Sequence, residues 1–214
     1  LGFPIDVISG REEARLIYQG VANLLPRSSD RRLVVDIGGR STELILGKNL
    51  DANQLQSFQL GSVTWSMKFF PGGKLGNSAF KQAEIAAMAE LDEASQIYHP
   101  GKWDIAYGSS GTIGAIAEIL TAAGQPPGII TRQGLEWLKS RMVRAKYLDN
   151  LQLDTLKDER KPVLAGGLAV LIAIFDVLQI SEMQHALGAL RQGVLYDLLN
   201  REQPTTDLRS TTVT

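Results

Sequence analysis

The chain has 214 residues, a formal net charge of −1 and a hydrophobic fraction of 44%. This length and balance are typical of one large globular domain or two small ones, and so small a net charge gives no general attraction for nucleic acids or membranes. The sequence has no cysteine and two histidines, which excludes disulfides, thiolate metal sites and cysteine nucleophiles and argues against a histidine-rich metal centre. Because a chain without cysteine fits a reducing compartment, we expect a cytoplasmic location, with no nucleic acid or membrane partner.

The first predicted helix follows a short strand at residues 5–8 and begins after Ser9. Apolar residues from Ala14 to Val21 recur at spacings of three and four, as one face of a helix requires. Ser9 is the expected N-cap, and Glu12 three residues later completes a capping box. Glu12 and Glu13 point about 100° apart on a helix, so at most one of them caps. Favourable interaction with the helix dipole is the structural alternative to a catalytic role for these acids.

Residues 33–46 are predicted to form a strand, a tight turn and a second strand. The first apolar run leads to Asp36, glycines at 38 and 39 interrupt it, and Glu43 precedes the second run. Glycines at the tip let the backbone approach a ligand closely. Amides and hydroxyls there suit phosphate oxygens, and the two carboxylates suit Mg²⁺. The alternative is an ordinary solvated turn, because Gly-Gly pairs are common in hairpins.

The rest of the chain predicts further strands and helices. Strands are expected at residues 53–60, 103–107 and 183–186, and helices at 62–70, 77–98, 113–120, 131–144, 162–175 and 194–199. The apolar helix at 162–175 is shorter than the roughly 18 to 20 residues of a membrane span, so we interpret it as a buried core helix. Three antiparallel strands followed by helices that alternate with strands predict an α/β fold with a mixed central sheet flanked by helices.

Residues 108–112, with the sequence Gly-Ser-Ser-Gly-Thr, lie between a predicted strand and a predicted helix. The first amides of a helix have no internal partners, so such a turn can cradle an anion or a nucleotide. Many turns of this kind contain glycine and serine for geometry alone, which is the structural alternative. If the strands share one sheet, we expect the turns at Gly38, Gly108 and Gly188 to line one cleft.

Six motifs in a fixed order carry a family resemblance. They read ISGREEARLIYQGV from Ile8, VVDIGGRSTELILG from Val34, FFPGG from Phe69, YGSSGTI from Tyr107, ERKPVLAGG from Glu159 and GALRQGVLYD from Gly188. Together they resemble the exopolyphosphatase and guanosine pentaphosphate phosphatase family over nearly the whole chain.

The resemblance implies a ribonuclease-H-like domain of the actin-like ATPase superfamily, whose domains occur in pairs and bind phosphates between them. Residues 1–200 would be the second domain of such a pair, and residues 201–214 a tail or linker. The chain begins with Leu1, not Met, and we expect an N-terminal partner domain with its own acidic strand and phosphate loop. Relatives are commonly dimeric, so a homodimer is a further expectation.

The resemblance also implies roles for individual residues. Glu13 matches the proposed general base, Asp36 the metal-associated acid, and Glu43 a second acid that places metal or water, with Mg²⁺ or another divalent cation as the cofactor. The residues that would hold phosphate oxygens are Gly38, Gly39, Ser41 and Thr42 in the hairpin and Gly108, Ser109, Ser110, Gly111 and Thr112 in the loop. Arg160, or Lys161 beside it, would contact the anionic ligand.

Two residues depart from the family pattern. Arg40 stands where relatives usually have a third glycine after Gly38 and Gly39. Its cation could bind phosphate bidentately, fold outward, or block the approach of the backbone to substrate. Gln192 replaces a glutamate of the GALREG motif, which removes a charge that could serve metal or packing. Neither change removes the predicted base or the predicted metal acid.

The sequence therefore predicts a phosphohydrolase domain that releases terminal phosphate from inorganic polyphosphate, with Mg²⁺ and with water activated by Glu13. Hydrolysis of guanosine pentaphosphate by the same residues is the nearest alternative. A noncatalytic polyphosphate-binding or nucleotide-binding regulatory module, in which Arg40 and Gln192 mark a degenerate site, is an alternative of another class. A sugar or acetate kinase half-domain shares the hairpin but has no role for the SGREEAR segment. Without its partner domain, the chain is expected to hydrolyse weakly or not at all.

Overall fold

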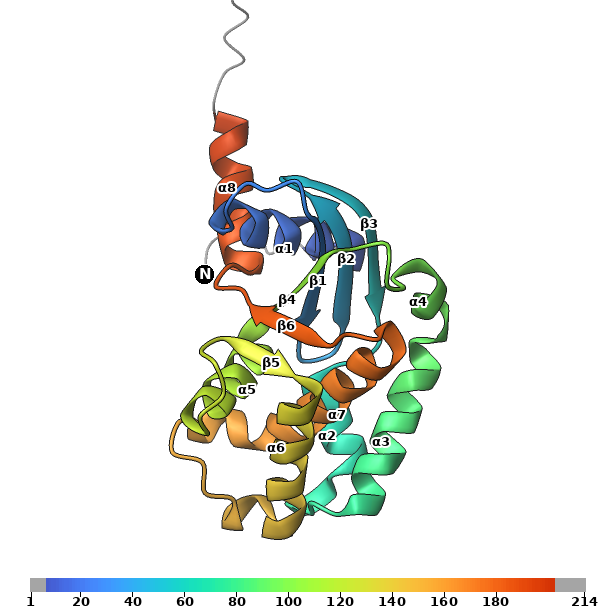
Figure 1. Cartoon of the computed structure of the whole chain (residues 1–214), viewed down its shortest axis with the longest axis vertical. Helices are drawn as coiled ribbons and strands as arrows, with labels where there is room; N and C mark the ends of the chain where they lie inside the picture. The colour runs from blue at the N-terminus through green and yellow to red at the C-terminus, as the bar shows by residue number, and fades with distance from the viewer. Residues whose placement is uncertain (1–6, 203–214) are drawn as a thin grey trace, which may run out of the picture.

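A computed structural model describes residues 7–202 of the chain. Six strands form one sheet: β1 (Arg31–Ile37), β2 (Thr42–Lys48), β3 (Asp51–Phe58), β4 (Ile105–Ser109), β5 (Ile129–Thr131) and β6 (Glu182–His185). Their order across the sheet is β3-β2-β1-β4-β6-β5 (Figure 1). The sheet is mixed, because β1, β4 and β6 are parallel while β2, β3 and β5 each run antiparallel to a neighbour.

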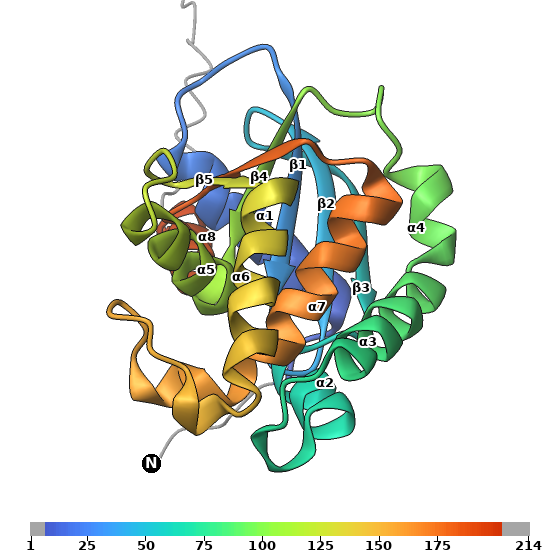
Figure 2. The same cartoon turned by 60° about the horizontal axis from the view of Figure 1, so that its bottom comes forward.

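Helices cover both faces of this sheet. They are α1 (Gly10–Leu24), α2 (Ser62–Phe69), α3 (Asn77–Glu90), α4 (Asp92–Ile97), α5 (Ser110–Ala122), α6 (Arg132–Ala145), α7 (Lys161–Leu178) and α8 (Leu190–Glu202), with short 3-10 helices η1 (Pro71–Gly73), η2 (Leu148–Asn150) and η3 (Asp158–Arg160). In Figure 2, α6 and α7 lie in front of the sheet and α1 and α8 behind it. The predicted fold class, α/β with a mixed central sheet flanked by helices, is confirmed.

Alternation along β1 divides the apolar side chains between two cores. Leu33 and Val35 join the larger core with α7, whereas Val34 packs with Ile17 of α1. Successive side chains of a strand point to opposite faces. Asp36 therefore shares the α1 face with Val34, at the end of the strand where the hairpin turn begins.

The apolar helix α7 is buried, as the sequence predicts. Pro162 lies in its first turn, where a helix needs no amide from that position. Among residues 7–202, the stretch Asp158–Leu178 alone has the length and hydropathy of a membrane span, and 72% of its most apolar window is buried in the protein. The predicted core helix is confirmed, and it extends three residues beyond the predicted 162–175, to Leu178.

Two elements differ from the predictions in the middle of the chain. The single helix predicted at residues 77–98 is wrong, because α3 and α4 are separated at Leu91, whose φ of −95° and ψ of 5° leave the helical region. Asp92 and Glu93 open the first turn of α4, where acids favour the positive end of the helix dipole. Strand β5 was not predicted, since three residues are too few to show a period.

The two ends of the chain also need correction. The short strand predicted at residues 5–8 begins outside the described residues, and Val7 and Ile8 are not in a strand. The predicted tail lies outside the described residues from position 203. The last helix, predicted at 194–199, begins earlier, because α8 already starts at Leu190. Gln192 Oε1 accepts the amide hydrogen of Ala189 at 3.2 Å, one half of a capping box, so this residue serves the start of the helix.

Glycines let α1 and α8 approach until their backbones touch. A Cβ atom added to Gly193 would overlap the carbonyl oxygen of Leu16, and one added to Gly188 would overlap that of Gly20. Only glycine leaves room for backbone at this range. The contact fixes how α1 lies against the sheet, and α1 carries the predicted base.

We expect Gly193→Ala to destabilise the chain by about 1–3 kcal/mol, because the added methyl overlaps backbone that cannot move alone. This loss should exceed the gain in helix propensity of about 1 kcal/mol that alanine brings. Gly76→Ala is the matched control, since no atom lies within 4 Å of its added Cβ. Urea unfolding of both variants checks the prediction, and equal stabilities would contradict the close crossing.

Candidate active site

Four polar side chains form a row across one end of the sheet, on the face that α1 covers. Asp36 of β1 is directly opposite Glu43 of β2, Ser57 of β3 is opposite Glu43, and Ser109 of β4 pairs with Asp36. Opposite residues on neighbouring strands point to the same face with Cβ atoms about 5 Å apart. Like charges in this position are normally destabilising. Packing alone therefore does not explain why Asp36 and Glu43 lie opposite each other.

A serine hydroxyl supports each acid of this polar row. Ser57 Oγ donates to Glu43 Oε1 at 2.7 Å, and Ser109 Oγ lies 2.7 Å from Asp36 Oδ2 and 2.9 Å from the carbonyl oxygen of Gly188. A hydroxyl has one proton. Ser109 therefore donates to an ionised Asp36, or donates to Gly188 while a protonated Asp36 donates to Ser109. The same side chain joins the end of β1 to the Gly188 turn.

Burial raises the pKa of both acids. The pKa of Asp36 rises to about 6 and that of Glu43 to about 7, mainly because burial disfavours the charged carboxylate. Hydrogen bonds from the two serines oppose these shifts, and the charge of Glu13 adds to both. The row therefore favours a proton or a cation beside its carboxyl groups.

Capping at the start of α1 separates its two neighbouring acids. Ser9 Oγ accepts the amide hydrogen of Glu12 at 3.3 Å, and the Ser9 carbonyl accepts that of Glu13 at 2.9 Å. The predicted capping box is only half formed, because the Glu12 carboxylate accepts from Arg15 Nη2 at 2.7 Å. Glu12 is thus occupied on the helix surface, which leaves Glu13 as the acid available to the sheet.

The first turn of α1 rests directly on the polar row. A Cβ atom added to Gly10 would lie 2.7 Å from Cβ of Ser57. Glu13 is close enough to Asp36 and Glu43 for its charge to raise the pKa of each. The structure therefore places Glu13 within range of Asp36 and Glu43 for its charge to act on both acids.

The hairpin tip turns its carbonyl groups inward, onto α2. The Gly38 carbonyl accepts the amide hydrogen of Ser62 at 2.9 Å, and the Gly39 carbonyl accepts that of Val63 at 3.0 Å. These bonds satisfy the first amides of α2, which has no side-chain cap. A Cβ on Gly61 would overlap the tip. The helix thus holds the turn in one conformation.

The amides of the tip remain available. Within residues 7–202, the amide groups of Gly39, Arg40 and Ser41 have no hydrogen-bond acceptor, and the Arg40 side chain is exposed. Consecutive free amides form a concave site that suits an anion. Thr42 differs, because it is fully buried and its hydroxyl donates to the Leu60 carbonyl at 2.6 Å.

The loop predicted at residues 108–112 is not a separate segment, because β4 ends at Ser109 and α5 begins at Ser110. Ser110 makes the turn with a φ of 87°, a value uncommon outside glycine. Its Oγ accepts the amide hydrogen of Ile113 at 3.3 Å, so the hydroxyl caps the helix. The positive φ of Ser110 is a strained backbone conformation, and such strain often marks a functional position.

Arg160 lies over the start of α5, as its predicted role requires. A Cβ on Gly111 would lie 2.6 Å from Nη1 of Arg160, so the guanidinium covers this glycine. Among residues 7–202, no carboxylate forms an ion pair with Arg160. The cation is therefore available to an anion at the helix N-terminus. Lys161 differs, because its ammonium pairs with Asp158 at 2.7 Å.

Three predicted phosphate contacts serve packing. Gly108 is enclosed by the side chains of Ile113 and Met183, and the methyl group of Thr112 packs against Gly167 of α7. Thr112 and Thr42 are both buried. Their side chains serve packing in this chain, and the phosphate contacts predicted for these two threonines stay predictions.

The sequence interpretation missed Ser57. Nothing in the local pattern of β3 marks this serine, because its position depends on the register of β3 against β2. A shift of one residue would turn it to the opposite face. Ser57 becomes recognisable only when Glu43 is known to lie opposite.

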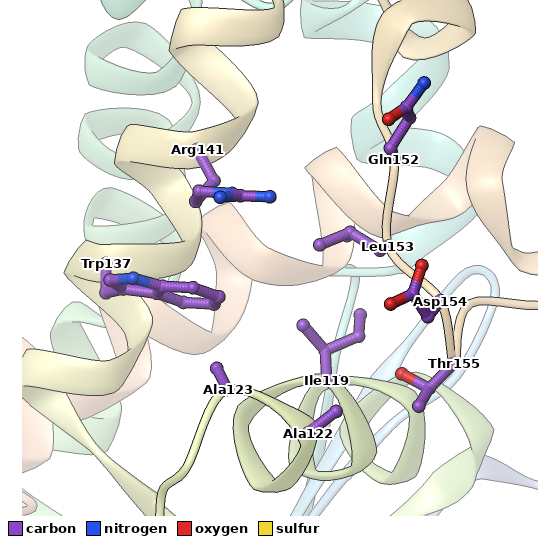
Figure 3. Close-up of a pocket in the computed structure, with 9 residues that line it drawn as sticks. All are labelled: Ile119, Ala122, Ala123, Trp137, Arg141, Gln152, Leu153, Asp154 and Thr155. Atoms are coloured by element: carbon purple, nitrogen blue, oxygen red, sulfur yellow. The ribbon is translucent and has the colours of Figure 1, made fainter.

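A distinct pocket of about 220 Å³ lies at the other end of α5 (Figure 3). Trp137 and Arg141 of α6 form one wall and Leu153 to Thr155 the opposite wall. None of the predicted site residues lines it. The polar row and this pocket are therefore separate places on the chain.

Residues 1–202 match the Ppx/GppA phosphatase family. The chain belongs to this family. Glu13, the hairpin tip and three of the four residues of the polar row lie in motifs through which the sequence resembles this family, whereas Ser57 lies outside them.

Solved structures from the family share the fold. The chain is 23% identical to the Aquifex aeolicus Ppx/GppA phosphatase, with a TM-score of 0.74, and the match covers 89% of this chain and 64% of the other. For an exopolyphosphatase from Cytophaga hutchinsonii the identity is 20%, the TM-score 0.78, and the coverage 91% and 65%. The likeness confirms the mixed α/β fold. The chain spans about two thirds of the length of these proteins.

Asp36 and Glu43 are the residues of the site that suit a divalent cation. Burial of these carboxylates disfavours their negative charge and raises their pKa values, and a bound cation would offset that cost. Among residues 7–202, no group of three or more side chains of metal-binding type converges on one point. Mg²⁺ nevertheless fits a site with one or two carboxylates, because phosphate oxygens and water usually complete its shell.

The raised pKa values predict how stability depends on pH. An acid whose pKa is higher in the folded state contributes stability that is present below its unfolded pKa and is lost as pH rises through the folded one. That window runs from 3.8 to about 6 for Asp36 and from 4.5 to about 7 for Glu43. Between about pH 4 and pH 8 without divalent cations, we expect wild type to lose roughly 1–3 kcal/mol more stability than Asp36→Asn.

Urea unfolding at several pH values measures this difference. Mg²⁺ added at the high-pH end should restore stability to wild type more than to Asp36→Asn. Parallel pH profiles for the two proteins would show that Asp36 titrates as an ordinary exposed acid.

Proposed function

We propose that this chain forms one wall of a phosphohydrolase site that releases terminal phosphate from inorganic polyphosphate. The observation that carries the proposal is the meeting of Glu13, Asp36 and Glu43 beside a hairpin tip with free amides. Phosphoryl transfer depends mainly on positioning and charge neutralisation. This wall offers a base, two metal-type acids and anion donors.

The terminal phosphate would bind at the hairpin tip. The amides of Gly39, Arg40 and Ser41 offer three donors, and α2 holds the tip in place through its carbonyls. Arg40 is exposed at the same turn, and its guanidinium can make two parallel hydrogen bonds to phosphate. Arg160 and the start of α5 would hold more of the anion.

Asp36 and Glu43 would hold a divalent cation, which neutralises charge on the phosphate when it is bound. Ser109 and Ser57 keep these acids oriented toward one face. The carboxyl oxygens are hard donors, and their burial disfavours charge without a counterion. The serines therefore position the acids and need not touch substrate.

Glu13 would accept the proton of the attacking water. Its side chain approaches the row from the first turn of α1, whose position the contact with α8 fixes. Because Glu12 is paired with Arg15, Glu13 is the only acid of the α1 first turn that is close to Asp36 and Glu43. A base held by a rigid element can take a proton in a defined direction.

We also propose that residues 1–200 are the second of two paired domains and that the first supplies the opposite wall. The chain spans 64% and 65% of the lengths of two solved structures from the family. The polar row and the hairpin tip lie at one strand end, so the other domain would face them there. One wall alone should hydrolyse weakly.

Glu13→Gln in a full-length protein tests the base. We expect the turnover number for polyphosphate to fall about 10²–10⁴-fold while substrate binding persists, because the amide cannot accept the proton. Glu12→Gln is the matched control on the adjacent position and should keep turnover near wild type. Phosphate release and equilibrium binding are the measurements.

Unchanged turnover in Glu13→Gln would remove Glu13 as the base. Binding without turnover in the wild-type full-length protein would favour the regulatory module. Phosphate release from guanosine pentaphosphate but not from polyphosphate would change the proposed substrate to guanosine pentaphosphate. The roles proposed for the residues would be unaffected.

Arg40→Ala distinguishes the three roles open to Arg40. If Arg40 binds phosphate, we expect KM for polyphosphate to rise about 10-fold or more with a smaller change in turnover. Arg27→Ala, at the opposite end of β1, controls for the general loss of one positive charge. An unchanged KM would mean that Arg40 folds outward, and a lower KM would mean that it hinders substrate.

A further inference from the structure

Arg32 of β1 is a buried cation without a counter-charge. Only 2% of its surface is exposed. Among residues 7–202, no ion pair includes Arg32, and its Nε has no hydrogen-bond acceptor. Burying an ionised group without an opposite charge is costly. The start of β1 therefore favours an anion nearby, just as the polar row at the other end of the strand favours a cation.

The guanidinium of Arg32 holds two surface loops by their carbonyl groups. Its Nη2 donates to the carbonyl oxygen of Pro26, in the loop before β1, and its Nη1 donates to that of Asn49, in the turn between β2 and β3, at 3.3 Å. The Tyr18 hydroxyl donates to the same Asn49 oxygen at 3.2 Å. Both carbonyl groups therefore point inward, toward the buried cation.

The inward carbonyls turn the next amides of the two loops outward. In a planar trans peptide, the carbonyl group and the N–H that follows it point in opposite directions. The amides of Arg27 and Leu50 therefore point away from Arg32. Within residues 7–202, neither amide has an acceptor, and the amides of Ser28 and Ser29 have none either. Neighbouring amides without acceptors suit an anion.

A hollow of about 760 Å³ lies between these two loops, with residues 27–29 and 48–51 as its lining. Lys48 adds a positive charge, and in the described part of the chain no ion pair includes it. Ser28 Oγ accepts the amide hydrogen of Asp30 at 3.3 Å and keeps its own proton to donate. Asp51 is the acid among the lining residues. We call this hollow the loop pocket.

We propose that the loop pocket binds a phosphate group. Phosphate oxygens accept hydrogen bonds from amides, hydroxyls and cations at the same time. The outward amides of both loops, Ser28 and Lys48 would donate to these oxygens, and the buried charge of Arg32 would attract the anion from beneath. A cation fits this place less well, because the carbonyl groups of Pro26 and Asn49 already face Arg32.

The loop pocket is separate from the hairpin tip. The register pairs Arg31 with Lys48 at one end of β1 and Ile37 with Thr42 at the other. The seven residues of this strand span about 20 Å, so the two places lie at opposite ends of the sheet (Figure 1). The inference therefore does not depend on the proposed hydrolysis, and either one can fail without the other.

Titration of the 214-residue chain with inorganic phosphate at constant ionic strength tests the proposal. Backbone NMR shifts at residues 27–29 and 48–51 report the loop pocket, and shifts at residues 38–42 report any phosphate at the hairpin tip. We expect a dissociation constant in the millimolar range at the loop pocket. Glucose 6-phosphate is the second probe. Equal affinity for both probes would mean that the phosphate group alone is recognised, and tighter binding of the ester would mean that the hollow also contacts its sugar.

Two lining residues of opposite charge should change the affinity in opposite directions. We expect Lys48→Gln to weaken phosphate binding at the loop pocket about 5–10-fold, and Asp51→Asn to strengthen it about 2–3-fold by removing a like charge. Lys81→Gln and Asp149→Asn remove exposed charges outside the pocket and are the matched controls, with no expected change. Thermal unfolding shows whether each variant keeps its fold.

Arg32→Met removes the buried cation and keeps an unbranched side chain. In this variant the phosphate-dependent shifts at the loop pocket should disappear, while any shifts at the hairpin tip persist. If Arg32→Met does not fold, the Lys48 and Asp51 variants decide the question. The proposal is overturned if residues 27–29 and 48–51 do not shift at tens of millimolar phosphate, or if Lys48→Gln and Lys81→Gln weaken binding equally. It is also overturned if Asp51→Asn binds phosphate no more tightly than Asp149→Asn.

Discussion

The register of β1 against β2 places Asp36 directly opposite Glu43, and burial keeps both carboxyl groups where their charges are disfavoured. A sheet selected only for stability would not keep two acids in this position. The two flanking serines reduce the cost without removing it, because the pKa of each acid stays raised. The strand end is therefore prepared for a positive partner, and the rest of the proposed site is arranged around this need.

Backbone contacts hold the other parts against this pair. Gly188 and Gly193 bring α8 onto α1, and Gly166 of α7 brings that helix onto Ser66 of α2. The first contact places Glu13, and the second steadies the helix whose first amides hold the hairpin carbonyls. Gly166, Gly188 and Gly193 thus act through helix packing and position the site from outside it.

Local patterns predicted much of this fold. The mixed sheet, the hairpin and the buried helix α7 follow from hydrophobic period and turn residues, and the acids of the site were singled out by their motifs. Features that depend on register or on close packing were not predictable. Ser57 is recognisable only opposite Glu43, and the burial of Thr42 and Thr112 depends on packing between elements that no local pattern shows. Gln192 looked like a lost charge, whereas its oxygen caps α8.

The most direct test of the account is the location of a divalent cation on the chain. Mn²⁺ added at low concentration broadens the NMR signals of amides near its binding site. If Asp36 and Glu43 hold the cation, residues 36–43 and Ser109 broaden first, and Asp36→Asn abolishes this effect. Earliest broadening at the exposed acids Asp158 and Glu159 in the wild type, with residues 36–43 unaffected, would contradict the assignment of Asp36 and Glu43 as the cation site.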